Sequence, residues 1–188
     1  MAQDRMPAIS ADRMTDAQRE AAASFAEGRG YQVRGPFAAM LRSPEVMLRA
    51  KAMGDYVRFK STIPTRLNEL AILITARHWV QNYEWHAHRP LAEKAGLKAA
   101  IAQAIADGHR PNAMAADEEI VYDFSTELHA NKSVSDATYR RALEAFGEQG
   151  IIDLTAANAY YTFNAMMMNV ARTALPANAK AELVPFPK

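Results

Sequence analysis

Three side chains that can carry protons are spaced so that helices could bring them together. Glu84 and His88 are four residues apart, so on a helix they lie on one face, where they can hydrogen-bond or share a proton. Glu69 lies among apolar residues, where an unpaired carboxylate is costly. If helices over 65–80 and 82–95 pack antiparallel, Glu69 can approach the same face. Such a cluster is suited to acid/base catalysis.

Structural roles for the same residues must be weighed against the catalytic one. A Glu-His pair four residues apart is more often found at a protein surface than in an active site. A buried glutamate on a helix more often pairs with a cation, and Arg66 and Arg77 are candidate partners for Glu69. The spacing therefore favours a catalytic cluster but leaves the structural alternative open.

The histidines do not have the spacing of a metal site. His86 and His88 would converge on one ion only from a strand, because on a helix their rings point about 200° apart. The chain has no His-Glu-x-x-His motif. We therefore expect no metal site. The remaining histidines are expected to have structural or surface roles; they are His78, His109 and His129.

The elements that position these residues are predicted to be helices throughout. We find no convincing alternation of apolar and polar residues that would indicate a strand. We expect an N-terminal arm over 1–10, one all-helical domain over 11–175 and an extended tail over 176–188. About eight helices are expected, in ranges set by apolar spacing, caps and glycine stops: 11–28, 37–42, 44–60, 65–80, 82–95, 97–106, 116–131, 136–147 and 151–174.

Composition excludes several classes of function. The chain has 188 residues, of which 49% are apolar, and this is enough for one domain with a buried core. It has no cysteine, so a disulfide framework, a thiolate nucleophile and a Cys-ligated zinc are excluded. The 22 basic and 21 acidic residues form no basic run, so we expect no nucleic-acid partner. Neither a membrane span nor a signal peptide is visible, which predicts a cytoplasmic protein.

Three segments around the acid/base residues resemble the carboxymuconolactone decarboxylase family, which includes the alkylhydroperoxidase D proteins. They read LNELAIL at 67–73, YEWHAHRPLA at 83–92 and AGL at 95–97. The shared pattern is a glutamate, fourteen residues, a second glutamate, three residues and a histidine. The resemblance implies a single-domain helical bundle of the alkylhydroperoxidase D-like type, assembled as a homotrimer or as a hexamer built from trimers.

The resemblance also separates two kinds of chemistry. The peroxidase branch has a Glu, two redox cysteines and a His, which fall here on Glu69, Gln81, Glu84 and His88. Because both cysteine positions are occupied by other residues, thiol peroxidase chemistry is excluded. The decarboxylase branch implies cofactor-free acid/base chemistry on a small lactone or unsaturated carboxylate from the breakdown of aromatic rings. The family also includes isomerases of ring-cleavage products.

Such a substrate would need a residue that binds its carboxylate. The segment before the family-like motif contains several arginines, and an arginine can hold a carboxylate with two parallel hydrogen bonds. Arg42 is the first candidate, because it stands just before the helix start at Ser43-Pro44. The other candidates for substrate contact are Arg49, Arg58, Tyr56, Tyr83, Trp85, Asn164 and Met168.

The sequence therefore supports two hypotheses of different classes. The first is a cofactor-independent decarboxylase or cis–trans isomerase. His88 would transfer the proton, Glu84 would orient it or set its protonation, and Glu69 would be a second acid or a structural partner. The second is a non-catalytic binding or assembly protein, in which Glu84 and His88 pair with each other or with Arg89 at the surface. A buried cavity lined by His88 and an arginine would contradict the second hypothesis.

Overall fold

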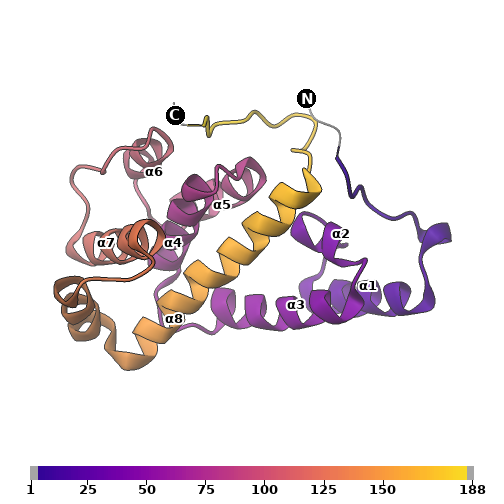
Figure 1. The fold of residues 1–188 in the computed structure, drawn as a ribbon, viewed down its shortest axis with the longest axis horizontal. Coiled ribbons are helices and arrows are strands. Elements are labelled where there is room, and N and C mark those ends of the chain that lie inside the picture. The colour runs from indigo at the N-terminus through magenta and orange to yellow at the C-terminus, as the bar shows by residue number, and fades with distance from the viewer. Residues whose placement is uncertain (1–3, 186–188) are drawn as a thin grey trace.

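All regular secondary structure in the computed structural model, which describes residues 4–185, is helical (Figure 1). A short 3-10 helix, Ala11–Arg13, precedes the α-helices. The α-helices are α1 (Asp16–Arg29), α2 (Pro36–Met40), α3 (Pro44–Phe59), α4 (Thr65–His78), α5 (Asn82–Lys94), α6 (Ala99–Ala106), α7 (Ala116–Asn131) and α8 (Asp136–Ala171). The all-α prediction with about eight helices is confirmed.

Local signals in the sequence set several of the helix ends. The Thr15 side chain accepts the N–H of Gln18, and the Gln18 side chain accepts the N–H of Thr15, which together form a capping box at the start of α1. The predicted helices over 136–147 and 151–174 are joined as α8 with a break at Gly147, whose φ of 68° no helical residue adopts.

Helix α4 forms the centre of the molecule. Every side chain from Leu67 to Arg77 is buried. The helix packs against α5, α6, α7 and α8, and a helix enclosed on so many sides must be apolar nearly all round. The Trp85 side chain from α5 is fully buried in the same core. A polar residue on α4, such as Glu69, therefore requires a partner inside the protein.

The N-terminal helices form a second apolar cluster on the other side of α8. Helix α8 runs between α4 to α7 on one side and α1 to α3 on the other (Figure 1). The cluster is built from Phe25 of α1, Phe37 of α2, Met47 of α3 and Tyr161 of α8, among others. Ile72 of α4 also belongs to it, so the two halves of the molecule meet across α4 and α8.

Both terminal segments lie along the helical body. The N–H of Arg5 bonds the carbonyl of Ala171 at 2.8 Å, next to the end of α8. Near the C-terminus, Leu183 is buried, and its backbone N–H and carbonyl both bond the side chain of Asn82 at the start of α5. The first three residues of the predicted arm and the last three of the predicted tail lie outside the described residues. Within the described residues, no helix has the length and apolarity to cross a membrane.

A buried polar network joins α4, α7 and α8. The Thr75 hydroxyl lies 3.0 Å from Nε2 of His129 and bonds the amide oxygen of Asn158. The Asn158 amide nitrogen in turn donates to the Ser125 hydroxyl at 3.1 Å. His129 was expected in a loop or at the surface, but it lies within α7 and is half-buried. Burial, together with the neighbouring His78 ring, lowers the pKa of His129 to about 4.

This network predicts a loss of stability in mild acid. The unfolded chain takes up a proton at His129 near the ordinary pKa of 6.5, whereas the folded chain resists protonation until about pH 4. The free energy of unfolding should therefore fall as the pH drops from 6.5 to 4, by up to about 3 kcal/mol from this group. Urea unfolding of His129→Asn should show a shallower fall. The exposed His109→Asn serves as control, and equal slopes in both variants would contradict the prediction.

Candidate active site

The start of α5 is fixed by the side chain of Gln81. Its amide oxygen accepts the N–H of Tyr83 at 2.8 Å and so caps the helix. Its amide nitrogen donates to Asn169 of α8, also at 2.8 Å. These two bonds hold α5 against α8, and the helical spacing then turns Glu84 and His88 to the same side.

His88 pairs with Glu69 and not with Glu84. Nδ1 of His88 lies 2.7 Å from a carboxylate oxygen of Glu69, and both side chains are buried. With Nδ1–H donating to the carboxylate, the other ring nitrogen, Nε2, is left as the acceptor of a neutral imidazole. The Tyr161 ring stands edge-on to the imidazole at 5.0 Å and limits its rotation. The result is a histidine of fixed orientation with one reactive nitrogen.

Glu84 is a buried acid without a counter-ion. Its side chain is only 3% exposed, and its Oε2 atom has no hydrogen-bond partner among the described residues. Burial raises the pKa of Glu84 well above its ordinary value of 4.5. A carboxyl group in this environment is held in its protonated form, in which it is a hydrogen-bond and proton donor.

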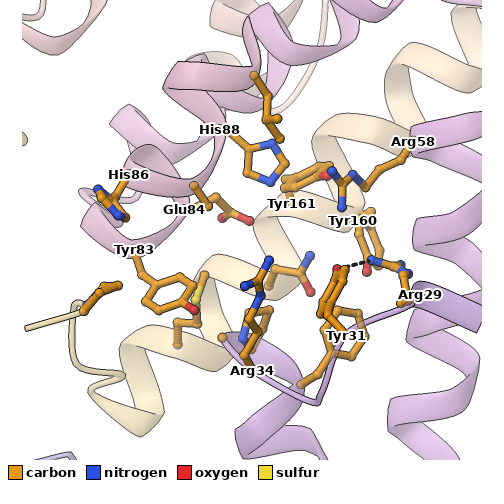
Figure 2. A pocket seen from close by; sticks show the side chains of 18 of the residues that line it. Arg29, Tyr31, Arg34, Arg58, Tyr83, Glu84, His86, His88, Tyr160 and Tyr161 are labelled. Atoms are coloured by element: carbon orange, nitrogen blue, oxygen red, sulfur yellow. Dashed lines mark hydrogen bonds between the residues drawn. The ribbon is translucent and has the colours of Figure 1, made fainter. Parts of the chain in front are cut away.

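A cavity of about 500 Å³ lies beside these residues, between α5, α8 and the N-terminal helices (Figure 2). Glu84 and His88 line it from α5. Tyr160 and Tyr161 line it from α8. This volume is within the range of binding sites for small molecules. The cavity therefore places two groups capable of proton transfer beside a space that a small organic substrate can occupy.

Three arginines line the side of the cavity formed by the N-terminal helices. The side chain of Arg29 is buried and bonds Asp55 at 2.6 Å, but Asp55 also pairs with Lys51 at 2.7 Å, so one carboxylate is shared by two cations. Arg34 and Arg58 make no ion pair within residues 4–185; their guanidinium groups lie over the rings of Tyr31 and Phe59. Two cations without carboxylate partners favour an anionic ligand.

The connector between α1 and α2 carries two of the lining residues, Tyr31 and Arg34. It is bounded by Gly30, with a φ angle of 72°, and by Gly35, with a φ angle of 58°; both angles are positive. A Cβ atom on Gly35 would lie 2.8 Å from the Tyr83 ring, so only glycine allows this close approach to α5. The connector therefore closes one side of the cavity.

Three of the buried polar atoms that lack a hydrogen-bond partner within residues 4–185 belong to residues that line the cavity. Nη2 of Arg29, Oε2 of Glu84 and Oδ1 of Asn164 are buried without a hydrogen-bond partner in the described part of the chain. All three residues line the cavity. Because buried polar groups in proteins are nearly always hydrogen-bonded, these atoms indicate a place where a ligand or water completes the bonding.

The structure brings together most of the predicted acid/base residues but fewer of the predicted binding residues. Glu84, His88, Tyr83, Asn164 and Met168 line the cavity, and Glu69 touches it through His88. Arg58 also lines the cavity, and the other four predicted contact residues lie elsewhere.

The other predicted contact residues have partners away from the cavity. Arg42 is exposed and bonds backbone carbonyls, including that of Pro7 at 2.8 Å. Arg49 is exposed and pairs with Glu45. The Tyr56 hydroxyl bonds Asp153 at 2.9 Å. Trp85 is fully buried in the apolar core. None of the four lines the cavity.

Sequence reasoning missed Arg29, Tyr31 and Arg34. The segment 29–35, which reads RGYQVRG, was interpreted only as a connector. The available signal was the pattern of two arginines on either side of a tyrosine, with a glycine next to each arginine. Nothing in its spacing relates it to α5, because the contact is made by long-range packing.

The imidazoles of α5 do not converge. His86 is exposed and His88 is buried, and Figure 2 shows the two rings well separated. Across the described residues, no group of three His, Cys, Asp or Glu side chains is arranged to hold a metal ion.

Comparison with known proteins supports the fold. No protein-family model matches the chain, and no curated protein matches it. Among solved structures, the chain is similar to an alkylhydroperoxidase AhpD core, an uncharacterized peroxidase-related protein from Ralstonia eutropha JMP134. The TM-score is 0.74, the alignment covers 92% of each chain, and 17% of the residues are identical. The chain therefore has an AhpD-like all-helical fold, as predicted.

Proposed function

We propose that this protein is a cofactor-independent acid/base enzyme that decarboxylates or isomerises a small unsaturated carboxylate or lactone from aromatic ring cleavage. One observation carries the proposal: the cavity is shared by an oriented histidine, a neutral acid and cations without carboxylate partners. The AhpD-like fold is compatible with it. The resemblance to the decarboxylase family further suggests a homotrimer or a hexamer built from trimers. From the composition we expect a cytoplasmic protein with no nucleic-acid or membrane partner.

His88 is the proposed proton-transfer residue. Its Nε2 atom is left free by the bond between Nδ1 and Glu69. Glu69 acts through His88, because a carboxylate at Nδ1 fixes the tautomer and stabilises the imidazolium that forms when Nε2 takes a proton. Glu69 is therefore a positioning residue.

Glu84 is the proposed acid. Burial raises the pKa of Glu84, so that it holds a proton which it can donate to a substrate oxygen or carbon. It lies one helical turn from His88 on the same side of α5. The two residues can therefore serve as base and acid on one bound molecule.

Arg58 and Arg34 are the proposed binding groups for the substrate carboxylate. Both line the cavity, and neither makes an ion pair in the part of the chain that the structure describes. A bound carboxylate would balance their charge with bidentate hydrogen bonds. These two residues take the role that sequence reasoning had assigned first to Arg42.

Both proposed reactions pass through a dienolate-like intermediate. In isomerisation, Nε2 of His88 removes a proton from carbon, the electron pair moves onto the substrate's oxygen, and rotation about the transiently single bond precedes return of the proton. In decarboxylation, the bond to the carboxyl carbon breaks, carbon dioxide leaves, and the electron pair remains on the substrate until carbon is protonated. Donors near the developing charge lower the barrier in either case.

Two other functions have less support. A non-catalytic protein was expected to pair Glu84 and His88 with each other or with Arg89 at the surface. Both residues are instead buried beside a cavity, and Arg89 pairs with Glu93. A thiol peroxidase needs a cysteine nucleophile, which the chain lacks.

The first prediction from this proposal concerns His88. A panel of aromatic ring-cleavage products should include one that wild-type protein converts, observed as a change in conjugated-diene absorbance with or without carbon dioxide release. His88→Ala should reduce turnover at least about a hundred-fold, because the proton-transfer group is lost. His109→Ala, an exposed control, should be unaffected. Unchanged turnover in His88→Ala would remove His88 from the mechanism.

Arg58 should affect substrate binding more than the chemical step. Arg58→Gln should raise KM about ten-fold or more, because a charged hydrogen bond to the substrate carboxylate is lost. Arg49→Gln provides the matched control, since Arg49 is exposed and lies outside the cavity. Steady-state kinetics of both variants test the assignment, and an equal KM in wild type and Arg58→Gln would contradict it.

Glu84→Gln should separate activity from stability. Because the pKa of Glu84 is raised, the contribution of this group to stability is fully present below the ordinary pKa of 4.5 and is lost as the pH rises through the folded pKa. Glutamine does not titrate, so the variant should gain stability relative to wild type as the pH rises, while its turnover falls.

Thermal unfolding across a pH series, paired with the turnover assay, measures both effects. Glu93→Gln, on the exposed part of the same helix, should change neither. If the stability of wild type and of Glu84→Gln changed in parallel with pH, Glu84 would be ionised like an ordinary carboxyl group, and the prediction would be wrong.

A further inference from the structure

Tyr31 is a cavity residue whose hydroxyl is polarised by a neighbouring cation. Nη1 of Arg29 donates a hydrogen bond to the Tyr31 oxygen at 3.2 Å. Because a guanidinium group has no acceptor, the phenol oxygen must be the acceptor in this bond. The Tyr31 proton is donated to no group within residues 4–185, so it remains available to a ligand in the cavity.

The surroundings of Tyr31 hold it in place. Its ring stands edge-on to Phe25 at 5.7 Å, and the Arg34 guanidinium lies over the ring at 4.3 Å. Arg29 is itself fixed by Asp55 and by contacts with the rings of Phe25 and Phe37. The hydroxyl is therefore a preorganised donor, and a bound ligand need not reorganise it.

Tyr31 differs electrostatically from the other tyrosines of the cavity. Burial tends to raise its pKa, but the hydrogen bond from Arg29 and the charges of Arg29, Arg58 and Arg34 outweigh burial and lower it. Burial raises the pKa of the remaining three, which are Tyr83, Tyr160 and Tyr161. The hydrogen bond from Arg29 and the lowered pKa together favour donation by Tyr31 to a developing negative charge.

The position of Tyr31 complements that of the acid/base residues. It lies with Arg29 and Arg58 on one side of the cavity, while Glu84 lies across from it on α5 (Figure 2). A planar substrate between the two sides would present one part to the residues of α5 and its oxygen to the connector. Tyr31 lies outside the family-like motif, and its spacing from the motif residues did not indicate a role.

We propose that Tyr31 is a further catalytic residue, whose hydroxyl donates a hydrogen bond to the substrate oxygen that becomes negatively charged. This role rests on the proposed function above. When His88 removes a proton, or when carbon dioxide leaves, the electron pair that remains moves onto this oxygen. Tyr31 keeps its proton throughout and stabilises the charge, which disappears when carbon is protonated again.

The test uses para-nitrophenolate, a coloured oxyanion that requires no turnover. Its visible absorption reports binding and ionisation in the cavity. Wild-type protein should bind the phenolate more tightly than the neutral phenol, and so lower the pKa of the bound probe. Tyr31→Phe should weaken phenolate binding about ten-fold or more, because one charge-assisted hydrogen bond is lost. Tyr139→Phe, which removes an exposed hydroxyl outside the cavity, should change it less than about two-fold.

The outcomes separate this proposal from the proposed function. Equal phenolate affinity in wild type and Tyr31→Phe, or no phenolate binding by wild type, would overturn the role of Tyr31 whatever the turnover assays show. Failure of every ring-cleavage product to react would overturn the proposed function. The phenolate affinities would then still measure the strength of Tyr31 as a hydrogen-bond donor. With a converted substrate, Tyr31→Phe should lower kcat more than it changes KM, whereas Tyr139→Phe should leave both near those of wild type. Thermal unfolding of both variants checks that they are folded.

Discussion

The bond between His88 and Glu69 is the constraint on which the site depends. Helix α4 is buried on nearly every side, so a carboxylate at Glu69 is tolerable only with a partner inside the protein. The partner comes from α5, across the 2.7 Å contact with the imidazole. Breaking a buried pair of this kind leaves an uncompensated group, which is why the position of α5 on α4 and the orientation of His88 are set together.

Charges in the cavity are arranged around this pair. On α5, burial keeps Glu84 neutral by raising its pKa. Across the cavity, Arg29 shares Asp55 with Lys51, whereas Arg34 and Arg58 pair with no carboxylate within the described residues. An anionic molecule would thus meet cations on one side and proton donors on the other. Exclusion of water by the aromatic walls would strengthen each of these interactions.

Helix periods and caps in the sequence were enough to predict the all-helical fold, because these signals are local. They also placed Glu84 and His88 on one side of α5. They could not identify the partner of His88: the four-residue spacing permits Glu84, but the packing of α4 on α5 brings Glu69 instead. Arg29 and Arg34 were missed for a related reason. Its place just before the helix start at Ser43-Pro44 suggested Arg42, whereas Arg34 reaches the cavity through a connector distant in sequence from the motif.

The two positions that the peroxidase pattern gives to cysteines have separate uses in this chain. Both polar groups of the Gln81 amide are occupied, one by the N–H of Tyr83 and one by Asn169, so this residue holds α5 in place. Glu84 has a buried oxygen without a partner in residues 4–185 and faces the cavity. Of the two positions, only Glu84 has a group available for reaction. In this chain the AhpD-like fold therefore holds a buried carboxyl group, and not a thiol, at the second of these positions.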